Sequence, residues 1–201
     1  TIFSSLILVS LMFVFGSFIG IISGYIGGLF DNIVMRIVDV FLAFPSLVLA
    51  IAVAGVLGGG MINAMIAIGV IGWTKYARLA RGEVLEIKEE TFIKAARLSG
   101  NSSMYIVFKH IMPRVLSTLI VTASLDIGTT IMEMAALSFL GLSSPLPIPE
   151  WGAMMNEGKS MIQFAPWITI APGIAIFIIV ILFNLLGDVV HDMLDPKQKE
   201  Y

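Results

Sequence analysis

Long uncharged stretches dominate the chain, and the first of them runs from Thr1 to Phe30 without a single charged residue. A helix needs about 20 mostly apolar residues to cross the roughly 30 Å hydrocarbon core of a membrane. The pattern therefore predicts a membrane-spanning helix from Ile2 to about Ile26. Glycines at every fourth position place a smooth strip along this helix; they are Gly16, Gly20, Gly24 and Gly28. Such a strip permits close helix packing, either against another subunit or within the bundle.

A second uncharged stretch runs from Val40 to Thr74. As one helix it would be about 52 Å long at roughly 1.5 Å per residue, which is too long for a single crossing. The three glycines at 58–60 divide it. We therefore expect one span from Asp31, as the helix N-cap, to Leu57, and another from Met61 past Tyr76.

Two further apolar stretches predict a fourth span from about Arg114 to Leu140 and a fifth from about Trp167 to Val190. The segment between them, residues 141–166, is rich in proline and amphipathic around Trp151 to Ile162. It is too polar to cross a membrane and too apolar for a plain linker, so we expect a short interfacial or re-entrant helix there. The predicted fold class is all-α, a polytopic membrane bundle with five spans.

Composition supports a lipid environment, because 58% of the 201 residues are hydrophobic and only 13% are charged. Soluble proteins average about 45–50% apolar and about 25% charged residues. The net charge of −2 offers no basic field for nucleic acid. The absence of cysteine excludes disulfides, thiolate metal sites and cysteine nucleophiles.

Positive residues orient the predicted bundle, because loops on the cytoplasmic side are enriched in lysine and arginine. Eight of the twelve lysines and arginines lie between Lys75 and Arg114 inclusive. We therefore place the loop at residues 82–113 in the cytoplasm. Lys75 and Arg78 are expected to extend their charged ends to the membrane surface.

The other connections follow from this placement. The C-terminal tail with Lys197 and Lys199 falls on the cytoplasmic side, and the Pro-rich segment 141–166 lies outside. Five spans leave Thr1 outside, so we expect a sixth helix upstream of it.

The cytoplasmic loop has more predicted structure than a simple connection needs. Residues 82–90 continue the preceding helix into water, and residues 91–100 form a short helix that Gly100 ends. A second amphipathic piece covers residues 101–110, and Pro113 begins the next span. A compact two-piece element of this kind suits a soluble partner that moves the membrane helices. The alternative is a merely solvated loop.

Within this loop the pattern Ala95-Ala96-x3-Gly100-x12-Pro113 resembles the EAA loop of binding-protein-dependent ABC importers. Lys94 stands where that motif has its leading glutamate, which weakens the expectation of a specific glutamate contact. Other stretches are similar to the second permease of the peptide and nickel class, in order along nearly the whole chain. They include Phe44-Pro45, Tyr76-Ala77-Arg78, Lys109–Pro113, Ser138–Leu142, Glu150-Trp151-Gly152 and Phe183–Asp188.

The resemblance implies a type I ABC importer permease, a single transmembrane domain over residues 1–201 whose loop docks on an ATPase. The loop residues implied in docking are Lys94, Ala95, Ala96, Gly100, His110 and Pro113. Implied partners are a homologous second permease, two ATPase subunits that carry ATP and Mg²⁺, an extracytoplasmic solute-binding protein and membrane lipid. The implied solute is a dipeptide, an oligopeptide or nickel as a metal chelate, crossing a bacterial or archaeal cytoplasmic membrane. No catalysis and no cofactor are expected in this chain itself.

Two acids, Asp126 and Glu133, lie inside the fourth predicted span, seven residues apart and so nearly on one helix face. Ionisable groups at that depth usually face a bundle interior or an aqueous path. One hypothesis is that they line the translocation route and favour a cationic or amine-bearing solute. The alternatives are pairing with a partner subunit and neutral, hydrogen-bonded side chains. Arg36 and Asp39 are expected to satisfy each other locally.

Two other functions compete with this interpretation. An ion-coupled secondary transporter could use Asp126 and Glu133 as its proton or sodium site. An integral-membrane enzyme is disfavoured, because the sequence contains no clustered acid–base or metal-ligating set. The stretch Gly152–Ser160 resembles a phosphate loop only superficially, since five residues separate its glycines where four are required.

Overall fold

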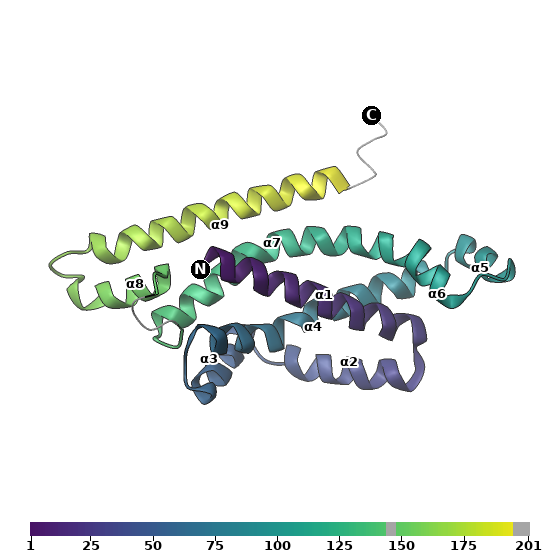
Figure 1. The fold of residues 1–201 in the computed structure, drawn as a ribbon, viewed down its shortest axis with the longest axis horizontal. Helices are drawn as coiled ribbons and strands as arrows, with labels where there is room; N and C mark the ends of the chain where they lie inside the picture. The colour runs from purple at the N-terminus through teal and green to yellow at the C-terminus, as the bar shows by residue number, and fades with distance from the viewer. Residues whose placement is uncertain (144–147, 195–201) are drawn as a thin grey trace.

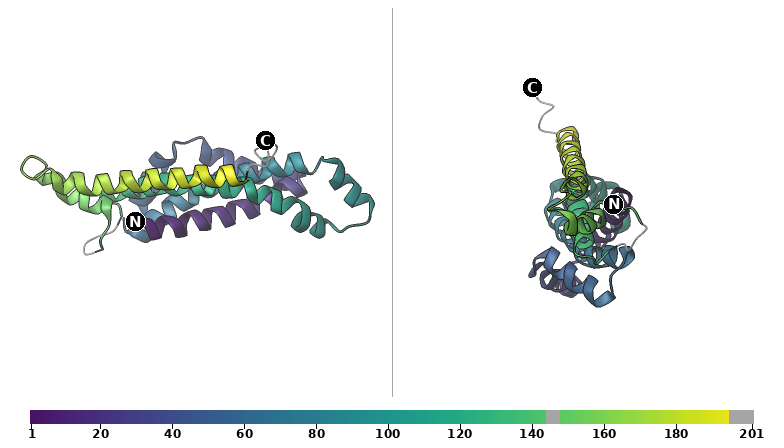
Figure 2. Two further views of the ribbon diagram at one scale, coloured as in Figure 1. Left: turned by 90° about the horizontal axis from the view of Figure 1, so that it is seen from above. Right: turned by 90° about the vertical axis from the view of Figure 1, so that its left-hand side faces the viewer.

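A computed structural model of the chain describes residues 1–143 and 148–194, which form an elongated bundle of helices (Figure 1). Its centre consists of α1 (Ile2–Ile26), α4 (Met61–Ile87) and α7 (Met112–Phe139). α9 (Trp167–Leu194) packs along α7. Figure 2 shows α9 on the opposite side of the central helices from α2 (Gly28–Leu42) and α3 (Ser46–Leu57). The described residues contain no strand, which confirms the all-α prediction.

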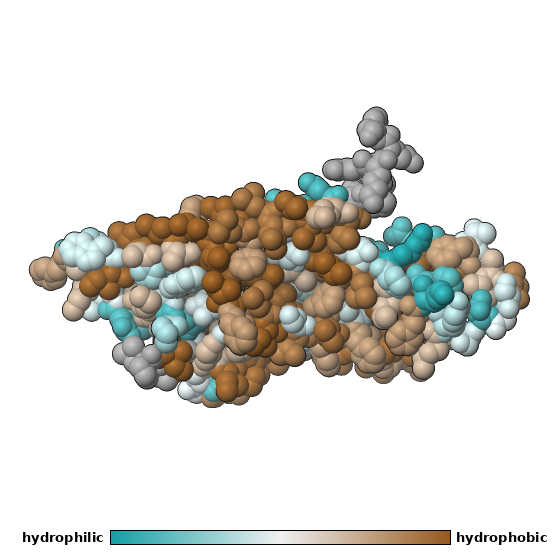
Figure 3. Space-filling model, turned by 45° about the horizontal axis from the view of Figure 1, so that its top comes forward, coloured by the Kyte–Doolittle hydropathy of each residue, from teal (hydrophilic) through white to brown (hydrophobic). Residues whose placement is uncertain are grey.

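The two ends of the bundle carry different short helices. α5 (Thr91–Leu98) and α6 (Ser103–Ile106) lie at one end, which we call the loop end. α8 (Trp151–Gly158) lies at the other, the α8 end, within the segment where a short helix was expected. On the face that Figure 3 shows, hydrophobic residues cover the middle of the bundle and polar residues gather toward both ends. This distribution is typical of a membrane protein, whose middle faces hydrocarbon and whose ends face water.

α4 is the core helix, and α1, α2, α3 and α7 all pack on it. Its buried face contains small residues such as Ala77 and Ala80, which allow other backbones to come close. Gly16 and Gly20 of α1 use this space: a Cβ on Gly20 would lie 2.3 Å from the carbonyl oxygen of Ala77. Gly24 also faces α4, at Val84. Gly16, Gly20 and Gly24 therefore serve packing within this chain, whereas Gly28, the fourth glycine of the predicted strip, begins α2 and has open space around it.

Three helices are long and apolar enough to cross a membrane: α1, the stretch Ser103–Phe139 that ends in α7, and α9. The bent pair α2–α3 provides a fourth crossing if it is counted as one span. α4 has 27 residues, enough for a crossing, but it is more polar than these helices. Because its neighbours cover it, α4 needs less apolar surface than a helix that faces lipid.

The span expected from Asp31 to Leu57 is not one continuous helix but the two helices α2 and α3. α2 and α3 meet at an angle of 89°, with the bend just before Pro45. Proline lacks the backbone N–H that would continue the helix, and it disfavours helical geometry at the residue before it. Asp31 is also not an N-cap, since α2 begins at Gly28 and Asp31 lies in its first turn.

Two predictions fall partly or wholly on residues that lie outside those the structure describes. They concern the Pro-rich segment, at residues 144–147, and the C-terminal tail with Lys197 and Lys199.

Candidate functional site

The loop between α4 and α7 folds as a helical hairpin. After α5 and α6, a π-helical turn over Val107–Ile111 leads directly into α7. Arg114 of α7 donates a hydrogen bond to the Glu90 carboxylate (Nη1 to Oε1, 2.8 Å), and its guanidinium lies 4.8 Å from the ring centre of Phe92. Three isoleucines of the hairpin are almost completely buried; they are Ile93, Ile106 and Ile111. The hairpin is therefore fastened to both neighbouring long helices.

The residues implied by the resemblance lie at different places on this hairpin. Ala95 is exposed and Ala96 is half-buried, both on α5. Gly100 has φ +81°, a conformation that side chains other than glycine rarely adopt, and it follows the end of α5. Lys94 is exposed and forms an ion pair with Glu89 (3.2 Å).

His110 and Pro113 belong to the second arm of the hairpin. The half-buried His110 ring contacts Phe92 and Tyr105 edge-on, with ring centres 6.0 and 5.8 Å apart, and so links the two arms. Pro113 is the second residue of α7, directly after the π-helical turn. α7 thus begins one residue before Pro113, but the helical backbone is continuous from Ser103 to Phe139, so Pro113 does not start a separate helix.

Exposed apolar side chains cover the outer part of the hairpin. Leu98 is 90% exposed, Met104 71% and Phe108 54%. Polar residues gather at this end of the bundle (Figure 3). Grouped apolar side chains on such a surface are typical of sites that contact another polypeptide. We call Ala95 and Leu98, both on α5, the loop surface.

A buried ion pair fastens the start of α2 to α4. Arg81 donates two hydrogen bonds to Asp31, from Nε to Oδ1 (2.7 Å) and from Nη2 to Oδ2 (2.6 Å). Ser23 of α1 donates a third to Asp31 Oδ1 (2.6 Å). The Asp31 side chain is only 8% exposed, so these three donors replace the water that the carboxylate loses on burial.

Two more ion pairs involve basic residues of α4. Arg78 pairs with Asp39 of α2, and Lys75 pairs with Asp126 of α7 (Nζ to Oδ1, 2.6 Å). The expected local pair between Arg36 and Asp39 is therefore wrong. Lys75 and Arg78 both reach carboxylates on neighbouring helices, and their extension to the membrane surface stays a prediction.

The structure places Asp126 and Glu133 in different environments. Asp126 is 12% exposed and pairs with Lys75, whereas Glu133 accepts a hydrogen bond from Ser46 Oγ of α3 (3.0 Å). Lys75 also lines an open cavity of about 650 Å³, together with Arg78, Glu83, Glu86 and Thr122. Sequence reasoning missed Lys75 as the partner of Asp126. The sequence feature that could have indicated this pair is the spacing of Lys75, Arg78 and Arg81 at every third position of α4. Residues with that spacing lie on one side of a helix, where they can reach carboxylates on neighbouring helices.

Acidic and histidine side chains form no metal-binding group in the described part of the chain. No three of the residues His, Cys, Asp and Glu lie close enough there to share an ion. Lys75, Arg78 and Arg81 of α4 and Asp126 of α7 instead form the ion pairs described above.

Comparison with known proteins shows extensive similarity. Residues 16–200 match the family model described as a binding-protein-dependent transport system inner membrane component. The dipeptide transport system permease protein DppC of Alkalihalophilus pseudofirmus is 45% identical over 186 residues. The glutathione transport system permease protein GsiD of Pectobacterium atrosepticum is 46% identical over 184 residues. Each alignment covers 92% of this chain and 61% of the relative, so the chain spans less than two thirds of the length of these relatives.

A solved structure shares the fold. A chain from the inward-facing conformations of the MetNI methionine ABC transporter superposes with a TM-score of 0.69 at 20% identity. The superposition covers 96% of this chain and 94% of that chain. The fold is thus that of a type I ABC importer permease, and the protein is a multi-pass membrane protein. Because the family model matches nearly the whole sequence, the chain belongs to the family of binding-protein-dependent transport system inner membrane components.

Proposed function

We propose that this chain is a membrane-spanning subunit of an ATP-driven importer, and that its hairpin at residues 82–113 is where an ATPase docks. The observation that carries the proposal is an exposed apolar surface on an element fastened to two central helices. Leu98 is exposed on the outside of α5, whereas Ile93 of the same helix is buried. A displacement of α5 therefore passes through Ile93 and the Glu90–Arg114 contact to α4 and α7. Rigid-body motion of packed helices is the expected response.

The remaining subunits follow from this role. The loop end faces the cytoplasm, where two ATPase subunits bind and hydrolyse ATP with Mg²⁺. The α8 end, with the segment 141–166, faces an extracytoplasmic solute-binding protein. A homologous second permease completes the translocation route in a bacterial or archaeal cytoplasmic membrane. The chain itself takes part in no covalent chemistry and holds no cofactor.

We propose a short peptide as the solute. The two relatives described above are named as a dipeptide and a glutathione transport permease, and neither name supports nickel. A short peptide carries an ammonium group and a carboxylate. Asp126, Glu133 and Lys75 together supply both signs of charge in the central part of the bundle. We place these three side chains along the translocation route.

The docking proposal is tested by Leu98→Glu in the co-expressed complex. A buried charge at the centre of an apolar contact is expected to weaken ATPase binding at least about 30-fold, the loss typical of a contact worth 2 kcal/mol or more. The ATPase should then be lost during purification, and ATP-dependent dipeptide uptake into proteoliposomes should stop. Phe164→Glu is the matched control, because Phe164 is 85% exposed in the turn between α8 and α9. Wild-type recovery of the ATPase with Leu98→Glu would contradict the proposal.

The ion-coupled alternative is tested in the same proteoliposomes. Dissipating proton and sodium gradients should leave uptake unchanged, whereas removing ATP should abolish it. Uptake that follows an ion gradient without ATP would support a secondary transporter instead.

A further inference from the structure

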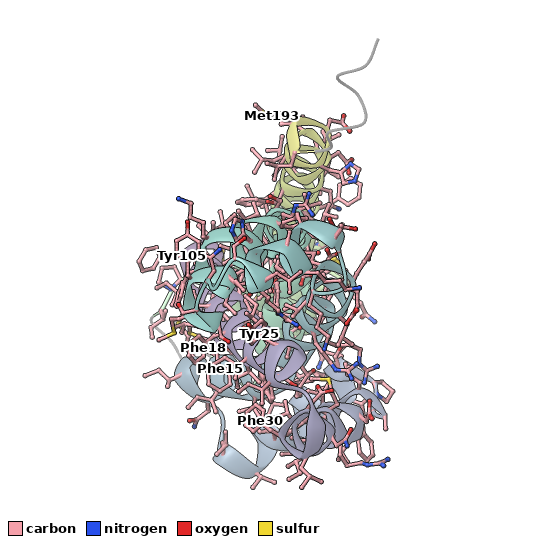
Figure 4. The ribbon with its side chains drawn as sticks, turned by 90° about the vertical axis from the view of Figure 1, so that its right-hand side faces the viewer. Phe15, Phe18, Tyr25, Phe30, Tyr105 and Met193 are labelled. Atoms are coloured by element: carbon pink, nitrogen blue, oxygen red, sulfur yellow. The ribbon has the colours of Figure 1, made fainter. Side chains whose placement is uncertain are left out.

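An apolar groove runs along the side of the bundle between α1 and the second arm of the loop hairpin. It has a volume of about 670 Å³. α1 contributes a row of residues from Phe13 to Ile26, and the facing wall comes from residues between Ser103 and Leu116. Nearly all of these side chains are apolar, including Phe18, Ile22, Val107 and Phe108. Figure 4, seen from the loop end, shows Phe18 and Tyr105 on the same side of the bundle.

The length of the groove matches one leaflet of a membrane. Its α1 wall runs from Phe13 to Ile26, about 20 Å at roughly 1.5 Å per residue. A bilayer with its headgroup regions is about 40–45 Å thick, so one leaflet is about 20–22 Å. The groove thus begins near the middle of α1 and ends where α1 meets the hairpin. A helix that crossed the whole membrane would need a longer contact, whereas a lipid chain of one leaflet needs this length.

Positive charge lies at the loop end of the groove. The guanidinium of Arg97 is 5.7 Å from the ring centre of Tyr25, which lines the groove. Lys109 lies 5.6 Å from the ring centre of Tyr105, next to the lining residue Met104. Within residues 1–143 and 148–194 neither cation forms an ion pair, although most other basic residues of the hairpin and α4 do. Two cations beside aromatic rings at a groove mouth complement an anionic headgroup.

We propose that this groove binds an anionic phospholipid of the leaflet nearest the hairpin. One acyl chain lies between α1 and the residues around Val107. The phosphate lies at the mouth, near Arg97 and Lys109. Because the two walls belong to α1 and to the hairpin, the bound lipid braces the ATPase-docking element against the membrane bundle. The site is separate from the cavity lined by Lys75, so it adds to the transport function proposed above.

Lipid retention by the purified whole complex tests the headgroup contact. The complex is delipidated in detergent and titrated with phosphatidylglycerol or phosphatidylcholine of identical chains, and bound lipid is counted by native mass spectrometry. We expect wild type to retain phosphatidylglycerol preferentially. Arg97→Gln and Lys109→Gln should each lower that retention about fivefold, which corresponds to about 1 kcal/mol for one charge near an anionic lipid. Arg36→Gln, which removes another exposed arginine outside the described ion pairs, should change nothing.

A second variant tests the acyl-chain contact. Val107→Trp fills the groove and should lower retention of both lipids, whereas Val56→Trp at an 89% exposed position of α3 should not. Retention unchanged in Arg97→Gln and Lys109→Gln would overturn the proposal, even if Val107→Trp fails to fold. A cross-link from Phe18→Cys, on the α1 wall of the groove, to another polypeptide in the intact complex would also overturn it, because a protein would then occupy the groove. Lipid binding is measured without transport, so a negative result here would leave the proposed transport function unaffected.

Discussion

The attachment of α2 to the bundle depends on very few contacts, which makes it a sensitive test of the structure. Asp31 and Val38 are the only residues of α2 that are buried. Asp31 receives two hydrogen bonds from Arg81 and one from Ser23. The change we consider is Arg81→Met, which keeps a long side chain and removes the guanidinium. It leaves the buried carboxylate of Asp31 with the Ser23 hydroxyl alone.

The size of the effect follows from burial. Removing one partner of a buried ion pair costs about 3–5 kcal/mol, because an uncompensated charge stays in the interior. Arg81 is 31% exposed, so solvent already screens part of the attraction, and the lower end of about 3 kcal/mol applies. Each 1.4 kcal/mol is about a tenfold change in an equilibrium constant. Local opening of α2 should therefore become roughly 100-fold more favourable.

Hydrogen exchange of the α2 amides in lipid nanodiscs measures this opening. Arg78→Met is the matched control on the same helix, since the Arg78–Asp39 pair is half-exposed and should contribute at most about 1 kcal/mol. Combining Arg81→Met with Asp31→Leu should restore most of the protection, because no buried charge is then left unpaired. Equal exchange in Arg81→Met and Arg78→Met would refute the reasoning, and so would a double variant that exchanges as fast as Arg81→Met.

Two further predictions concern helix packing and the acids of α7. Gly20→Val should destabilise the fold by about 1–3 kcal/mol or more through overpacking, since its Cβ would lie 2.3 Å from a backbone oxygen of α4. The thermal unfolding temperature should fall accordingly. Gly55→Ala has open space around it and should be neutral or slightly stabilising; equal losses in the two variants would contradict the close contact. Asp126→Asn and Glu133→Gln should each reduce dipeptide uptake by a complex that still assembles. Wild-type uptake by both would exclude them from the translocation route.

Sequence patterns located most of the helices, because the signals for them are local. The uncharged stretch at the start of the chain gave α1 with both of its bounds. Pro113 marked the start of α7 to within one residue, and Gly100 marked the end of α5. Glycine and proline restrict or free the backbone at their own positions, so their effect can be read without knowing the rest of the fold.

Features that depend on distant neighbours could not be predicted in the same way. The stretch from Asp31 to Leu57 is continuously apolar beyond Asp39, and hydropathy contains no information on the direction of a helix after Pro45. Charge pairing depends on which helices touch: Arg36 is near Asp39 in sequence, but α4 brings Arg78 to it instead. Lys75 reaches Asp126 across 51 positions of the chain, and only the packing of α4 beside α7 creates that pair.

The sheltered position of α4 has a consequence for experiments on sidedness. A helix enclosed by its neighbours tolerates lysine and arginine, so a count of crossings based on hydrophobicity alone omits it. If one crossing is omitted, every later segment is assigned to the wrong side of the membrane. Those segments include the hairpin that follows α4, and α8. Reporter fusions placed before and after α4 would detect this reversal directly, since the two must give opposite signals whenever α4 traverses the bilayer.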